Sequence, residues 1–326
     1  MVTAPRTIKK SPEIPDELLA KLREFLVTRQ VLNGIALLDA NAHLFASLDP
    51  GQRNAAALAG AVAQWVDVGY RGLELVEQLL ARFPRAQRGR LPLCDYVHLR
   101  MAEGLLALRQ DHPDEALRHF DLVLMLQEEI EDKEVVAIAH FWNAHCHRKK
   151  GEYDEALKRC AVGRELAAAL GFPCMAAVMR VLESWLLFQK GHIRDAQRIL
   201  DQAEAALRNT DDDVTLGNIY SAHGRMVRRQ GQYTQALNFF TQAIECFRRR
   251  YPHHRNLARS LANIAYVQRL LALQMIKQMD AESRRRRKSR VSGKAAGARG
   301  RKPDTREQYE ELRSSAFANL DQAEKI

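Results

Sequence analysis

Apolar residues recur every three to four positions along most of the chain, and short breaks containing glycine, proline or charged residues separate these stretches. Such spacing places apolar side chains on one face of an α-helix, so each stretch predicts an amphipathic helix. In the middle of the chain the pattern predicts helices paired as 91–109 with 113–130, 133–149 with 153–170, 174–190 with 193–208, and 212–230 with 233–250. An all-α fold with short connections follows.

Four segments align without gaps at a spacing of 40 residues. They are DHPDEAL at 111–117, GEYDEAL at 151–157, GHIRDAQ at 191–197 and GQYTQAL at 231–237. Each carries an alanine at one position (Ala116, Ala156, Ala196 and Ala236) and a small residue twelve positions earlier (Gly104, Ala144, Ser184 and Gly224). A further residue follows each alanine by four positions (Phe120, Cys160, Leu200 and Phe240), bulky in all copies but the second. Antiparallel helices approach to about 8–10 Å only where the crossing residues are small.

These small-residue positions resemble those of the tetratricopeptide repeat. The resemblance implies a right-handed α-solenoid, a superhelix of antiparallel helix pairs. The usual repeat has about 34 residues, whereas this one has 40. That length resembles the long repeats of bacterial signal-responsive transcription activators of the maltose-regulon type, the MalT-like regulators. The turn glycine is present in three copies but is Asp111 in the first, where Pro113 marks the helix start.

The repeat pattern divides the chain into five parts. We expect a disordered N-terminus at 1–15, divergent N-terminal helices with a capping pair at 16–90, repeats at 91–282, a basic disordered insertion at 283–303, and the second helix of a fifth pair at 304–326. The N-terminal helical segments are expected near 16–47, 52–68 and 70–83, and a further helix at 255–282. The sequence AFANLDQAEK at 316–325 echoes AQRILDQAEA at 196–205, and the chain reaches Ile326 within this helix. Further repeats are therefore expected in a full-length protein.

The net charge of +10 is concentrated in one stretch, 284–302, which contains ten basic residues and no acidic one. Without these ten, forty Lys and Arg balance forty Asp and Glu. The candidate basic loop consists of Arg284, Arg285, Arg286, Arg287, Lys288 and Arg290. Such a run can contact phosphates or acidic partners weakly, or serve as a solubilising loop. It lacks the aromatic residues that stack on single-stranded bases.

The first helix of each pair lines the concave face of a solenoid and supplies the candidate binding groove. Transfer of the groove-facing positions of the tetratricopeptide repeat gives Met101, Leu105, Arg109, Phe141, His145, Lys149, Val181, Trp185, Gln189, Ser221, Arg225 and Arg229, with Arg148, Phe188 and Arg228 beside them. Aromatic anchors with cationic rims suit a protein or peptide ligand. The alternative is that the aromatic residues among them pack against neighbouring helices.

Catalytic and metal-binding motifs are missing from the sequence. His140, His145 and His147 flank Cys146, but the consecutive positions 145–147 point in different directions on a helix, so a structural role is expected. No phosphate-binding loop, HExxH or GxSxG motif occurs, and no cofactor is predicted. Five unpaired cysteines indicate a cytoplasmic protein, and neither a signal peptide nor a membrane span is recognised.

The sequence therefore favours a non-catalytic scaffold or adaptor that binds a protein or peptide partner. The alternative function is the sensor portion of a bacterial transcription regulator whose DNA-binding unit lies outside these residues. No helix-turn-helix pattern accompanies the basic run. No oligomeric state is predicted.

Overall fold

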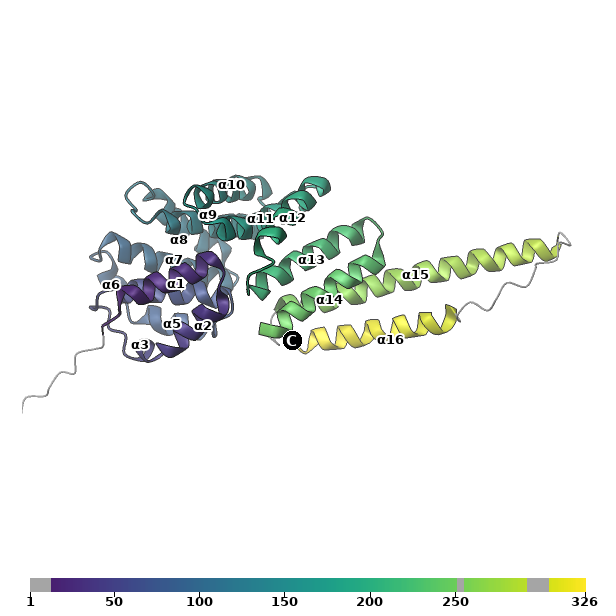
Figure 1. The fold of residues 1–326 in the computed structure, drawn as a ribbon, viewed down its shortest axis with the longest axis horizontal. Coiled ribbons are helices and arrows are strands. Elements are labelled where there is room, and N and C mark those ends of the chain that lie inside the picture. Colours follow the sequence, from purple (N-terminus) through teal and green to yellow (C-terminus); the bar gives the residue numbers. More distant parts are fainter. Residues whose placement is uncertain (1–12, 251–254, 292–304) are drawn as a thin grey trace, which may run out of the picture. The chain divides into compact units, whose positions relative to one another are not determined.

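Helices are the regular secondary structure throughout the described part of the chain (Figure 1). The computed structural model describes residues 13–250, 255–291 and 305–326. Two compact units make up the chain, unit 1 at residues 1–212 and unit 2 at residues 213–326. Consecutive helices pair within each unit, which confirms the predicted all-α, tetratricopeptide-like solenoid. No helix among the described residues is long and apolar enough to cross a lipid bilayer.

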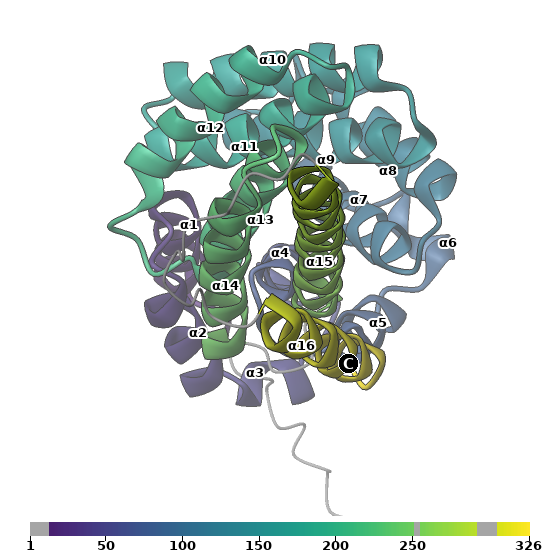
Figure 2. The same cartoon turned by 90° about the vertical axis from the view of Figure 1, so that its right-hand side faces the viewer.

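Unit 1 begins with short helices and continues as three longer helix pairs. Its helices are α1 (Asp16–Thr28), α2 (Val31–Ala40), α3 (His43–Ala46), α4 (Ala55–Asp67), α5 (Leu73–Ala81), α6 (Arg85–Arg88), α7 (Leu93–Arg109), α8 (Pro113–Met125), α9 (Lys133–Lys150), α10 (Tyr153–Ala169), α11 (Pro173–Gln189) and α12 (Ile193–Leu207). Figure 2 shows α9 and α11 on the inner side of this unit, with α10 and α12 outside them. The first helices of the pairs thus line the inner face, as in a solenoid.

Glycine in a left-handed conformation ends the first helix of the later pairs. Gly151 has φ 82° and Gly191 has φ 88°, values that residues with a Cβ rarely adopt. The backbone N–H groups of Gly151 and Glu152 donate to carbonyl oxygens of the last turn of α9, at 3.1 and 2.9 Å. Asp111 takes the same conformation in the first copy, with φ 66°, and Pro113 starts α8. The prediction that Pro113 marks the helix start in the copy that lacks the turn glycine is confirmed.

The small residues of the repeat set the distance between paired helices. Ala116, Ala156 and their counterparts in the other two copies are completely buried. A Cβ added to Gly104 would lie 2.7 Å from the ring of Phe120, so only glycine admits this close crossing. In the third copy the hydroxyl of Ser184 donates to the carbonyl oxygen of Ala196 at 2.7 Å, which satisfies the buried polar group.

An ion pair between neighbouring repeats recurs at the repeat spacing. Nζ of Lys150, the last residue of α9, lies 3.1 Å from Oδ1 of Asp114 at the start of α8. Forty residues further on, Lys190 pairs with Asp154 in the same way. Exposed pairs of this kind contribute little to stability, because solvent screens the charges. They join adjacent helix pairs at equivalent positions of the repeat.

The N-terminal helices contact parts of unit 1 that lie far along the chain. Arg23 of α1 pairs with Asp132 before α9 at 2.5 Å, and α1 also contacts α4 and α11. The carboxylate of Asp211, which follows α12, accepts hydrogen bonds from the backbone N–H groups of Val31 and Leu32. These contacts connect the first helices to the last repeat of the unit.

Unit 2 consists of two helix pairs, α13 (Asp213–Arg229) with α14 (Tyr233–Arg250) and α15 (Arg255–Val291) with α16 (Thr305–Glu324). The predicted boundary of helix α15 is wrong. The helix does not end near 282 but continues to Val291, through the run that was expected to be a disordered loop. Arginine and lysine have high helix propensity, so a solvated basic run can extend an existing helix. The remainder of the predicted insertion, 292–303, and most of the expected disordered N-terminus, 1–12, lie outside the described residues.

Candidate partner-binding site

Helices α9, α10 and α11 bring aromatic and cationic side chains together on unit 1. We call Phe141, His145, Arg148, Tyr153 and Trp185 the aromatic–cationic patch. The ring of His145 lies edge-on to Phe141 with 4.6 Å between the ring centres. The guanidinium carbon of Arg148 lies 5.1 Å from the centre of the Trp185 ring, and Tyr153 meets this ring edge-on at 5.8 Å. Residues from two adjacent repeats therefore form one surface.

The patch is neither core nor open surface, because all five of its residues are half-buried. An aromatic ring in this position can be covered further by a partner without unfolding the repeat. Guanidinium groups stack favourably on such rings, so the contact with Trp185 helps to fix the position of the Arg148 guanidinium group. The arrangement places an apolar contact surface and the positive charge of Arg148 next to each other.

The imidazole of His145 is neutral at physiological pH. Burial lowers its pKa well below the usual range, and the positive charges of Arg148, Arg109 and Lys149 lower it further. A desolvated ring surrounded by cations disfavours a second charge. The positive potential beside the patch therefore comes from arginine and lysine and does not depend on titration of this histidine.

Two of the predicted groove cations already have acidic neighbours. Arg109 forms an ion pair with Asp67 at the end of α4. Lys149 pairs with Asp111 and also donates to the backbone carbonyl oxygen of Leu108, at 3.2 Å. A partner that binds Arg109 or Lys149 would thus compete with these contacts.

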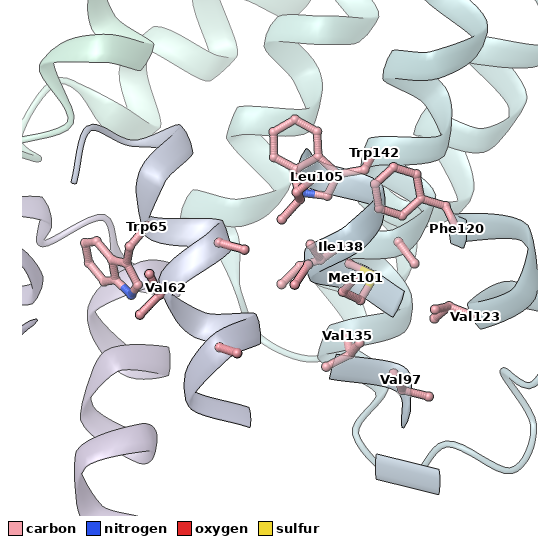
Figure 3. Close-up of a cluster of buried hydrophobic side chains, with 14 of the residues drawn as sticks. Val62, Trp65, Val97, Met101, Leu105, Phe120, Val123, Val135, Ile138 and Trp142 are labelled. Carbon is pink, nitrogen blue, oxygen red and sulfur yellow. The ribbon is translucent and has the colours of Figure 1, made fainter. Parts of the chain in front are cut away.

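Several predicted groove residues are in the core. Met101 is completely buried and Leu105 nearly so, and Figure 3 shows both within the hydrophobic cluster of unit 1. The prediction that Met101 contacts a partner is wrong, because α4 packs along α7 and covers this face. Phe188 and Ser221 are also buried, so they too are excluded as direct contacts. Val181 is half-buried and Gln189 is exposed.

Three predicted arginines belong to unit 2. Arg228 is half-buried, donates to Oδ1 of Asn263 at 2.9 Å and lies 5.0 Å from the centre of the Tyr266 ring. Burial lowers its pKa from the ordinary arginine value. Arg225 is half-buried and Arg229 exposed. Their helix α13 thus carries an arginine–aromatic contact of its own within unit 2.

A small cavity adjoins Phe141 on the inner side of unit 1. Its volume is about 40 Å³, which is room for a few water molecules or one small side chain. The lining residues are Leu26, Arg29, Gln64, Asp67, Val68, Ile138, Phe141, Trp142, Met175, Val178 and Met179. Helices α1 and α4, together with residues Arg29 and Val68 that follow them, supply almost half of this wall. Sequence reasoning missed them, because their place in this wall depends on contacts between segments that are far apart in the sequence.

The histidine and cysteine cluster of α9 is dispersed over the helix. His140 and Cys146 are buried, and burial lowers the pKa of His140 to about 4 and raises that of Cys146 to about 12. Nδ1 of His147 lies 2.6 Å from the carboxylate of Glu152. The described residues contain no group of three or more His, Cys, Asp or Glu side chains arranged to hold a metal ion.

The basic run lies in the last part of α15. Arg284 and Arg285 are exposed there. The backbone of Arg286, Arg287, Lys288 and Arg290 is part of the same helix, while their side chains lie outside the described residues. The basic residues up to 290 are thus presented on a helix and not on a loop.

Comparison with known proteins supports the class of fold that this geometry defines. Residues 215–287 match the tetratricopeptide repeat family. No curated protein sequence matches the chain. The chain is thus an α-solenoid of paired helices, and its residues 215–287 match tetratricopeptide repeats.

Three solved structures share this arrangement over most of the chain. A Rap protein complexed with Competence and Sporulation Factor is similar with a TM-score of 0.62 and 11% identity, over 94% of this chain and 86% of that chain. The apo form of the quorum sensor NprR from B. thuringiensis has a TM-score of 0.60 and 13% identity, over 95% of this chain and 76% of that chain. NprR in complex with its cognate peptide NprX has a TM-score of 0.57 and 13% identity, over 96% of this chain and 84% of that chain. Identities this low show similarity of fold.

Proposed function

We propose that this chain is a non-catalytic adaptor that binds a protein or peptide on the inner side of its solenoid. The observation that carries the proposal is the aromatic–cationic patch, with the ring of Trp185 under Arg148 and its edge against Tyr153. Half-buried aromatic residues with an adjacent arginine are the usual composition of strong contact points in interfaces. The similar fold of NprR, whose structure contains its cognate peptide NprX, supports a peptide as the ligand.

The chemistry of the patch favours a ligand with an apolar side chain next to a carboxylate. An apolar group can cover the exposed parts of Phe141 and Trp185, while a carboxylate can accept hydrogen bonds from Arg148 in bidentate geometry. Because His145 stays neutral, such binding is expected to change little between pH 6 and pH 8 through this residue.

A synthetic peptide library with acidic and neutral members tests the proposal. We expect selection of peptides that combine an apolar with an acidic residue, and a loss of about 1–2 kcal/mol in affinity for Trp185→Ala. Tyr96→Ala is the matched control, because Arg100 stacks on Tyr96 at 4.7 Å on α7, away from the patch. Denaturant unfolding of both variants separates lost contacts from lost folding. Equal losses of affinity in the two variants, or no selection from the library, would contradict the proposal.

The second candidate function is the sensor portion of a transcription regulator. The helical presentation of the basic run on α15 favours it, as does the resemblance in repeat length to MalT-like activators. A gel shift with random duplex DNA at low and at physiological salt discriminates the two functions. Strong binding that falls steeply with salt would support the regulator, since phosphate contacts release counterions.

A further inference from the structure

Helix α16 leaves exposed the face that is buried in the other repeats. Leu320 is 46% exposed and Phe317 is 59% exposed. The sequence echo between 316–325 and 196–205 aligns Leu320 with Leu200, which is completely buried in α12. The echo in sequence therefore does not reproduce the packing, and two large apolar side chains of α16 lack cover within unit 2.

The face of α16 that contacts α15 is a different one. Gln268 of α15 donates to Ser315 at 2.7 Å and accepts from Asn319 at 3.1 Å, and Ala323 and Ile326 pack against the core of unit 2. At about 100° per residue, Leu320 is displaced by about 100° and Phe317 by about 160° from Asn319. Phe317 therefore points away from α15, and Leu320 lies to the side of the contact face.

The exposed residues form a stripe with opposite charges at its ends. Arg313, Phe317, Leu320 and Glu324 are spaced by four, three and four residues, which places them along one side of the helix. All four are exposed. Arg313 pairs with Glu310 of its own helix at 3.3 Å, an exposed contact that a stronger partner can replace. The stripe is therefore cationic at one end, apolar in the middle and anionic at the other end.

Such a stripe is complementary to itself in antiparallel orientation. If Phe317 faces Leu320 of the partner subunit, then Arg313 faces Glu324 of the partner subunit, and the two-fold axis repeats both contacts. Across residues 311–326 this alignment opposes no two charges of the same sign. A parallel alignment in register would instead place each Arg313 beside its own counterpart. Two-fold symmetry requires this kind of self-complementarity.

We propose that the exposed stripe of α16 is a self-association surface, on which a second copy of this chain docks antiparallel. Burial of Phe317 and Leu320 supplies the affinity, and the Arg313–Glu324 contacts set the orientation. One helix per subunit makes a small interface, so the dimer is weak and depends on concentration. This surface is separate from the aromatic–cationic patch, and its test does not involve a peptide ligand.

Sedimentation velocity over a range of protein concentrations tests the proposal. We expect a reversible monomer–dimer equilibrium whose dissociation constant rises at least tenfold in Phe317→Ser. Arg313→Glu and Glu324→Arg should each weaken the dimer severalfold, and the double variant should restore it, because the swapped charges again oppose each other. Ile276→Ser, at an exposed apolar position on α15, is the matched control and should leave the equilibrium unchanged.

Circular dichroism of each variant verifies folding, which these exposed substitutions should preserve. A chain that stays monomeric at all concentrations would overturn the proposal. So would a dimer that is insensitive to Phe317→Ser, or a double charge swap that fails to restore the association. An equal effect of Ile276→Ser would assign the contact to α15 and also overturn it.

Discussion

The carboxylate of Asp211 accepts a hydrogen bond from the backbone N–H of Leu32, at 3.0 Å, across 179 residues of sequence. It also accepts one from Val31, so both amides at the start of α2 are satisfied by a residue beyond α12. Side-chain caps normally come from the residue just before the helix. Here Gln30 holds that position and makes no cap. The end of unit 1 thus supplies the cap for its beginning.

Replacement of Asp211 by alanine should lower the stability of unit 1. Loss of a helix cap costs about 0.5–2 kcal/mol, and the N-terminal helices should also exchange their amide hydrogens faster. Hydrogen exchange resolved by residue measures both. Glu129→Ala, at an exposed acidic residue between α8 and α9, is the control. Unchanged protection of α2 in Asp211→Ala would show that the cap does not hold the N-terminal helices.

Addition of one methyl group at Gly104 should destabilise the first repeat. The new Cβ would meet the Phe120 ring at 2.7 Å inside a packed core, and overpacking of this kind costs about 1–3 kcal/mol. Chemical denaturation measures the change. Gly89→Ala is the control, because its Cβ meets no atom within 4 Å and should change stability by less than about 0.5 kcal/mol. Equal midpoints for the two variants would refute the proposed crossing.

The period of 40 residues contains enough information to predict the repeat core. Ala156 and Gly104 had to be small, since the crossing distance of two helices depends on the side chains at the crossing itself. That information is local to each pair. The position of Met101 was not predictable in this way, because its burial depends on α4, which lies before the first repeat and does not share its pattern.

Two other differences have similar physical causes. A run of arginines is compatible with a disordered loop and with a solvated helix. Here the run is helical because it continues the helix formed by the preceding residues of α15. For the candidate site, only the place of Trp185 in one groove with Arg148 beside it followed from the repeat positions, and the stacking of the two side chains did not. The contribution of Leu26 and Arg29 to the adjacent cavity did not, because no local pattern records a contact with helices so distant in sequence.

Stability should depend on pH through Glu134. Burial raises the pKa of this carboxyl to about 7, an effect that Arg23 opposes and Asp132 reinforces. The folded state therefore binds a proton more tightly than the unfolded state, so stability falls as pH rises from about 4.5 to about 7.

Glu134→Gln should remove this dependence. We expect the variant to be more stable than the parent by roughly 1–3 kcal/mol at pH 8 and similar to it at pH 4. Thermal unfolding at a series of pH values provides the measurement, with Glu129→Gln as the exposed control. A stabilisation that is the same at pH 4 and pH 8 would rule out titration of Glu134 as the cause.

Neutralisation of Arg148 should raise the pKa of His145. The positive charge of Arg148 is the second cause of the low pKa after burial, so Arg148→Gln should move the titration of this ring upward while burial keeps it below the usual value. NMR titration of the histidine ring protons measures this change in the pKa of His145. In Arg159→Gln the ring of His140 should respond instead, since Arg159 acts on that residue. A shift of His145 in the control and none in Arg148→Gln would contradict the patch geometry.

The ion pairs Lys150–Asp114 and Lys190–Asp154 have a consequence for how this chain can change in length. If one block of 40 residues between Asp114 and Lys190 were removed, Lys190 would take the place of Lys150 and meet Asp114, with the small crossing residues also in step. A deletion of any other size would leave both charges opposite unrelated residues and shift the crossing. Gene duplication and loss can therefore lengthen or shorten this solenoid by whole repeats, while insertions of intermediate size are tolerated only in the turns between helices.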